Sequence, residues 1–129
     1  MLVSDLVTRT LVLAGVLQAG RAASAYQMDE GVDALNDMLT QWAVDGIDLA
    51  QATLTSTATI YAMKGHLRAL RYNLAVELAT HFGLPVAPAI AVYADDSLRV
   101  LRNSLFEIDN MTIDNALQRP VTDFDFTNG

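Results

Sequence analysis

The acidic residues and the histidines of this sequence have the side chains that could catalyse hydrolysis or bind a metal ion. Glu77 is the one acid within a nearly apolar stretch, and a buried carboxyl group without a partner can serve as a general acid. His66 and His81 match no recognised spacing of metal ligands. Asp95 and Asp96 are adjacent, so on a helix their side chains diverge by about 100° and cannot share one substrate. We therefore expect no metal and no catalytic centre, and an arginine partner is the simpler expectation for Glu77.

Other motifs that carry chemistry are absent from the sequence. It contains no cysteine, which excludes disulfides and thiolate chemistry, and it has neither a glycine-rich phosphate loop nor a Gly-x-Ser-x-Gly nucleophile motif. Trp42 is the single tryptophan, and its helical spacing from Leu35 and Leu39 favours packing in a core over stacking on a base or sugar. We expect a protein that is not an enzyme and needs no cofactor.

Composition predicts one acidic domain with a substantial core. The chain has 129 residues, 52% of them apolar, and a formal net charge of −7. Such a surface does not grip the phosphate backbone, although it lets DNA slide past without adhesion. No run reaches the roughly 18 apolar residues of a membrane span. Residues 11–17 resemble the apolar part of a secretory signal, but Arg21 follows them and the apolar period starts before Arg9, so we favour a core helix.

Apolar periodicity predicts a mainly α fold, a bundle of about four helices. The first helix is expected over residues 4–19, with Ser4 as its N-cap and Gly20 at its end. Gly15 would then lie inside this helix, where it could allow a close helix crossing.

Three further helices are expected after residue 24. Ser24 and Gln27 have the spacing of a capping box and open the second helix, which ends at Gly46. The third and fourth helices are expected over residues 66–83 and 88–108. The side chains expected in the core are Leu35, Leu39, Trp42, Leu74, Leu78 and Leu101.

Charge is unevenly distributed along the predicted helices. Lys64, Arg68 and Arg71 crowd the start of the third helix, where cations oppose the helix dipole, so a neutralising partner is expected. Arg99 and Arg102 are expected in surface ion pairs, with Asp95 one turn before Arg99. The second helix carries a solvated, strongly negative face, which could supply the neutralising partner and consists of Asp29, Glu30, Asp33 and Asp37.

Two segments do not follow a helical period. Residues 52–62 are rich in threonine and alternate in polarity, which predicts a short β-strand or ribbon that must find a partner. Residues 110–129 form a tail after a helical domain of residues 1–109. In this tail Phe124 and Phe126 have strand spacing, which suits docking of an extended segment on a partner.

Several stretches resemble the head-completion adaptor proteins of tailed phages, also called tail accessory or packaged-DNA stabilisation proteins. The resemblance covers residues 6–109 and is densest in residues 6–17 and 33–49. Residues 74–79 (LAVELA) are similar to the Leu-Ala-x-Glu-Leu-Ala helix of that family. The ending of residues 124–129 (FDFTNG) is similar to its Phe-x-Ile-x-x-Gly terminus. One departure is a shorter strand region between Thr53 and Lys64.

The resemblance implies a structural virion protein at the head-tail junction, which is present in the host cytoplasm during assembly. It implies a ring of twelve copies below the portal protein that extends the DNA channel, helps to retain packaged DNA and receives tail, tail-needle or nozzle proteins. The residues implied in binding portal or a neighbouring copy are Pro120, Val121, Phe124 and Phe126. Two alternatives stay open: a small cell-wall-acting hydrolase that uses Glu77, and an acidic helical module for protein interaction.

Overall fold

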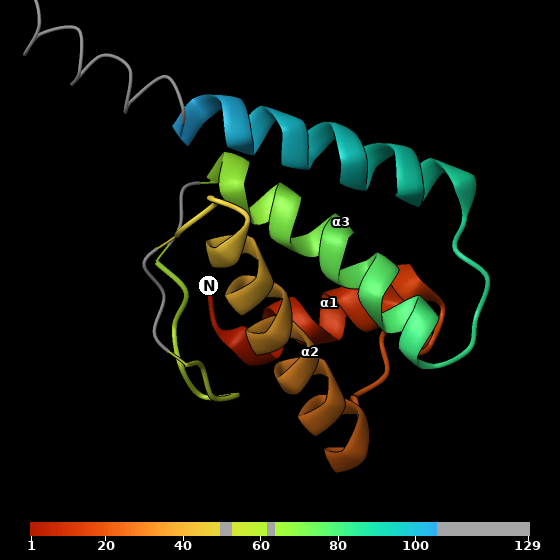
Figure 1. Cartoon of the computed structure of the whole chain (residues 1–129). Coiled ribbons are helices and arrows are strands. Elements are labelled where there is room, and N and C mark those ends of the chain that lie inside the picture. The colour runs from red at the N-terminus through yellow and green to blue at the C-terminus, as the bar shows by residue number, and fades with distance from the viewer. Residues whose placement is uncertain (50–52, 62–63, 106–129) are drawn as a thin grey trace, which may run out of the picture.

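A computed structural model of the protein describes residues 1–49, 53–61 and 64–105. Within these residues the helices are α1 (Val3–Ala14), α2 (Ala25–Val44), α3 (Lys64–His81) and a fourth helix over residues 88–105. Figure 1 shows the fourth helix beside α3 and opposite to it in direction, while α1 and α2 lie on the other side of α3. The predicted mainly α fold is confirmed. None of the described helices is both long enough and apolar enough to cross a membrane.

The first helix is shorter than the predicted span of residues 4–19. It ends at Ala14 because Gly15 adopts the left-handed conformation, with φ of 83°, and its N–H donates back to the carbonyls of Leu11 and Val12. Gly20 also has a positive φ, but it lies in a later turn. The interpretation of Gly15 as an interior residue at a helix crossing was therefore wrong.

The start of α1 is capped by a distant loop rather than by Ser4. The N-cap position is Leu2, whose side chain makes no capping hydrogen bond. Instead, the backbone N–H groups of Val3 and Ser4 donate to the carbonyls of Ala58 and Ser56, over 2.9 and 3.1 Å. The carbonyls of residues 56 and 58 thus replace the side-chain cap that the sequence led us to expect.

No strand forms in the described part of the predicted β segment, residues 53–61. These residues form a loop with one isolated antiparallel bridge, between Leu2 and Thr59. The Ile60 N–H donates to the Met1 carbonyl over 2.8 Å. The prediction of a strand or ribbon was wrong. Residues 1–4, at the start of α1, supply hydrogen-bond partners for the backbone groups of Ser56, Ala58 and Ile60, so these groups need no second strand.

Asn36 of α2 fixes the same loop from its other side. Its Nδ2 donates to the Leu54 carbonyl over 2.9 Å, and its Oδ1 accepts from the Leu54 N–H over 2.8 Å. A single amide side chain therefore satisfies both backbone groups of Leu54, whose own side chain is buried. The loop is held between α1 and α2.

The second helix is closely packed against α1 at Gly31. A Cβ atom at Gly31 would lie 2.3 Å from Cγ1 of Val7, so glycine is required for this approach of the two helices.

The predicted capping box at the start of α2 is confirmed, since Ser24 and Gln27 exchange hydrogen bonds of 3.1 and 3.0 Å. At the other end, Gly46 adopts a φ of 93°.

One hydrophobic core joins the helices. Thr10 is buried within it, and its hydroxyl donates to the Leu6 carbonyl over 2.6 Å. Leu39 is only partly buried, because it lines an open groove of about 430 Å³ beside the end of α2. The other side chains expected in the core are buried, namely Leu35, Trp42, Leu74, Leu78 and Leu101.

The fourth helix is joined to α3 by a polar contact as well as by apolar packing. Asn73 Nδ2 donates to the Ala69 carbonyl of its own helix and to the Ala94 carbonyl of the fourth helix, over 2.9 and 3.0 Å. Ala94 and Ser97 are buried and small, which allows the two helices to approach closely. This pair of helices presents a cluster of arginine and tyrosine side chains, namely Arg68, Arg71 and Tyr72 on α3 and Tyr93 on the fourth helix.

The two capping serines are expected to differ in their effect on stability. Ser24→Ala removes a side-chain cap and should lower the free energy of unfolding by about 1 kcal/mol. Ser4→Ala should change it by less than about 0.5 kcal/mol, since Ser4 lies inside α1 and makes no cap. Urea unfolding followed by circular dichroism measures both. An equal loss for the two variants would contradict the assignment of the caps.

Candidate functional site

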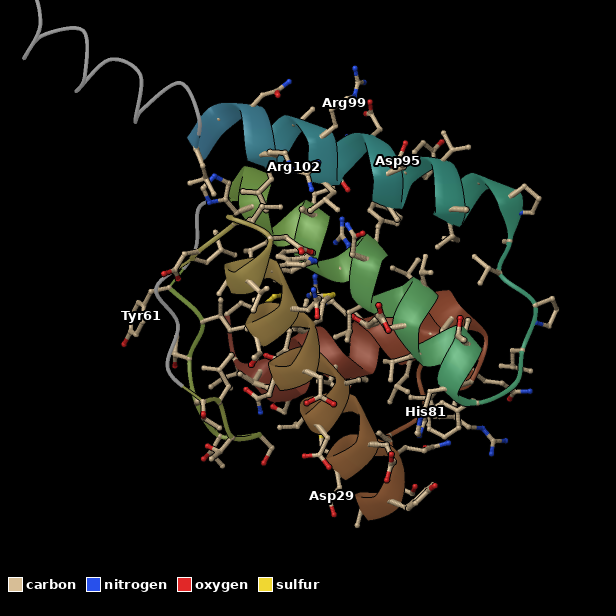
Figure 2. The ribbon with its side chains drawn as sticks, viewed as in Figure 1. Asp29, Tyr61, His81, Asp95, Arg99 and Arg102 are labelled. Atoms are coloured by element: carbon tan, nitrogen blue, oxygen red, sulfur yellow. The ribbon has the colours of Figure 1, made fainter. Side chains whose placement is uncertain are left out.

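The acidic face of α2 consists of three aspartates. Asp29, Asp33 and Asp37 are exposed and recur every four residues, which places them on one side of the helix. Figure 2 shows Asp29 near the start of α2, pointing away from the other helices. No ion pair involves these three carboxylates within the described residues. The face therefore presents a row of uncompensated negative charge.

Glu30 was predicted to belong to this face, but it turns toward α3. Its Oε2 lies 2.7 Å from Nε2 of His81, which stands in the last turn of α3, where a cation is favoured by the helix dipole. The His81 ring also meets the Phe82 ring edge to face, with centroids 5.1 Å apart. Glu30 thus joins α2 to α3 instead of facing solvent with the aspartates.

The arginines near the start of α3 do not contact the acidic face, contrary to expectation. The Arg68 guanidinium lies 5.7 Å from the centroid of the Tyr72 ring and 5.5 Å from that of Tyr93. Arg71 lies 5.3 Å from the Tyr72 centroid. Tyrosine rings accept these cations through cation–π contacts, which leave their charge uncompensated. Among the described residues, no carboxylate pairs with either arginine.

Arginines from three separate segments line one groove, which we call the basic groove. Its volume is about 770 Å³, and it lies between α1, the turn of residues 19–22 and α3. Arg9, Arg21 and Arg71 supply its charge, while Val12, Leu13, Ala19, Ala22 and Tyr72 supply most of its remaining lining. A smaller hollow of about 270 Å³ continues it past Arg9 and Arg71 to Arg68.

Sequence reasoning missed the basic groove. Arg9, Arg21 and Arg71 are far apart along the chain, and no local spacing relates them. The one signal was the pair Arg68 and Arg71, whose i, i+3 spacing places two cations on one side of a helix. Arg9 joins them because α1 packs against α3, and Arg21 joins them from the turn of residues 19–22 that lines the same groove.

The candidate catalytic residues are not brought together. Glu77 is exposed on α3, so the hypothesis of a buried general acid was wrong. Asp96, rather than the predicted Asp95, pairs with Arg99. Figure 2 shows Asp95 and Arg99 on the outer side of the fourth helix. No group of three or more histidine, aspartate or glutamate side chains in the described residues could hold a metal ion.

The predicted docking residues of the tail, Pro120, Val121, Phe124 and Phe126, lie outside the described residues. Comparisons of the chain with protein-family models, with curated proteins and with solved structures found no match.

Proposed function

We propose that this chain is a structural subunit of the head-to-tail junction of a tailed phage. In this role it forms a ring below the portal protein, twelve copies by analogy with the family that the sequence resembles. The ring extends the DNA channel, helps to retain packaged DNA and offers a surface to tail components. The protein is then a virion component that assembles in the host cytoplasm.

The separation of charge on the helical domain is the observation that carries this proposal. The three aspartates of α2 are exposed and uncompensated, whereas the four arginines of the basic groove and its extension lie on α1, α3 and the turn between α1 and α2. A channel wall must not hold DNA, and an acidic helix face repels the phosphates. The arginines lie on other elements than this face, so they leave a separate charged surface for contact with a neighbouring copy, and such contacts form a ring when the rotation closes.

Native mass spectrometry of the full chain, alone and mixed with the portal ring of the same phage, tests the proposal. We expect a complex that contains one portal ring and many copies of the chain. Deleting residues 121–129 should lower the amount of this complex about tenfold or more, because the tail supplies aromatic anchors. A chain that stays free in the presence of portal would overturn the adaptor function.

An acidic module for protein interaction is the remaining candidate, because the same row of aspartates supports it. This candidate predicts binding through α2 alone. Asp33→Asn with Asp37→Asn would then abolish capture of the portal or of any other partner, while deletion of residues 121–129 would leave it intact. The hydrolase alternative has lost its basis, since Glu77 is exposed.

A further inference from the structure

We propose that the basic groove receives the C-terminal segment, residues 121–129, of a second copy of this chain. The inference deepens the proposed function and rests on it for the closed ring. It names the surface on one subunit that binds the tail of the next.

Positive charge is scarce in this protein and is concentrated at the groove. The whole chain has 8 lysine and arginine residues against 15 acidic ones. Four of these cations, Arg9, Arg21, Arg68 and Arg71, line the basic groove and the hollow that continues it. Within the described residues none of the four pairs with a carboxylate. In a chain with a net charge of −7, this arrangement leaves a localised site for an anionic partner.

The lining of the groove also requires an apolar partner. Val12 and Leu13 line it together with the arginines and are partly buried, and Tyr72 adds an aromatic ring. A purely charged ligand would leave this apolar area in contact with water. The exposed aspartates of α2 in a second copy are therefore a poorer match, because no large apolar side chain alternates with them along that face.

Residues 121–129 offer both kinds of group in the required order. Asp123, Phe124, Asp125 and Phe126 alternate, and the segment contains no cation. In an extended peptide, alternate side chains lie on opposite sides, so the two phenyl rings form one apolar side and the two carboxylates form one acidic side. The groove offers a match for each, because its lining includes Val12, Leu13 and Tyr72 as well as the guanidinium groups of Arg9, Arg21 and Arg71. Arginine also binds carboxylate through paired hydrogen bonds, which gives the contact specificity.

The chain between the fourth helix and this segment is long enough for the contact. Residues 106–120 span at most about 50 Å when fully extended, whereas a domain of about 100 residues has a radius of gyration of about 13 Å. The segment can therefore reach a neighbouring copy. Because groove and tail are different surfaces of one chain, their contact is head-to-tail and can repeat around a ring.

The inference predicts complementation between two variants of the full chain. One carries Arg9→Glu and Arg21→Glu, two exposed changes in the groove. The other carries Phe124→Ala and Phe126→Ala in the tail. In sedimentation velocity, each variant alone should self-associate at least about tenfold more weakly than the native chain. An equimolar mixture should give a 1:1 complex, in which the intact tail of the first variant occupies the intact groove of the second.

Matched controls separate the basic groove from general charge effects. Arg99→Glu with Arg102→Glu makes the same charge change at exposed positions of the fourth helix and should leave self-association unchanged. A chain with Asp123→Lys and Asp125→Lys in its tail should bind the native groove more weakly. The same tail should bind a groove that carries Arg9→Glu and Arg21→Glu, because both charges are then reversed. Raising salt from 0.05 to about 0.5 M should weaken the native contact, since exposed charges are screened.

Several outcomes would overturn the inference. The mixture of the two variants could stay monomeric, or the Phe124→Ala, Phe126→Ala variant could self-associate as the native chain does. Self-association could also require Asp33 and Asp37 of α2 instead of the tail. Groove-dependent binding of a labelled DNA duplex in place of the tail would also overturn it. A monomeric chain that still binds portal refutes only this inference, whereas a self-associating chain indifferent to portal refutes only the proposed function.

Discussion

Gly31→Ala is expected to destabilise the protein by about 1–3 kcal/mol, although alanine normally favours a helix over glycine. The added Cβ would lie 2.3 Å from Cγ1 of Val7, and Val7 is fully buried in the core, so α1 and α2 must separate. The free energy of unfolding, measured with urea and circular dichroism, gives the size of the effect.

Two further variants identify the clash as the cause. Gly65→Ala in α3 meets no atom within 4 Å and should be neutral or stabilising by up to about 1 kcal/mol. Val7→Ala removes the methyl groups that Gly31→Ala would meet, so the double variant should lose less stability than the sum of the single losses. Strict additivity would refute the proposed contact at the helix crossing.

Asn36→Ala is expected to lower the free energy of unfolding by about 2–4 kcal/mol, because it leaves two backbone groups without a partner. The Leu54 N–H and carbonyl bond the Asn36 side chain over 2.8 and 2.9 Å. The loop of residues 53–61 also caps α1, so the loss should spread beyond Leu54. Hydrogen exchange of the Val3, Ser4 and Leu54 amides should therefore accelerate more than exchange in α3.

Thr40→Ala provides the matched control for Asn36→Ala. Thr40 is one turn further along α2, and among the described residues its hydroxyl donates only to the Asn36 carbonyl of its own helix, over 2.9 Å. Its replacement should cost less than about 0.5 kcal/mol. Two results would show that the Asn36–Leu54 hydrogen bonds do not support the cap of α1. One is an equal loss in the free energy of unfolding for Thr40→Ala and Asn36→Ala. The other is unchanged protection of the Val3 and Ser4 amides from exchange in Asn36→Ala.

The parts of the fold that sequence predicted are those set by local chemistry. The Ser24 and Gln27 capping box and the end of α2 at Gly46 depend on residues within a few positions of each other. The periodicity that placed Leu35, Leu74 and Leu78 on inward helix faces is equally local, since one helix turn determines it.

The parts that could not be predicted depend on packing between distant segments. Gly15 and Gly31 both lie in segments with a helical apolar period. Only the position of Val7 shows that Gly31, and not Gly15, lies where two helices cross. The threonine-rich loop has a strand pattern, but its hydrogen-bond partners are the amides at the start of α1. The basic groove was missed for the same reason, because three of its arginines come from separate segments.

The cap of α1 has a consequence for the order of folding. Residues 3–14 are synthesised before residues 56 and 58, whose carbonyls accept from the Val3 and Ser4 amides. The first turn of this helix therefore cannot be completed until the loop that contains residues 56 and 58 has been synthesised and α2 has positioned this loop through Asn36. Contacts of such sequence separation form slowly, so α1 acquires its native first turn late although it is synthesised before α2 and α3.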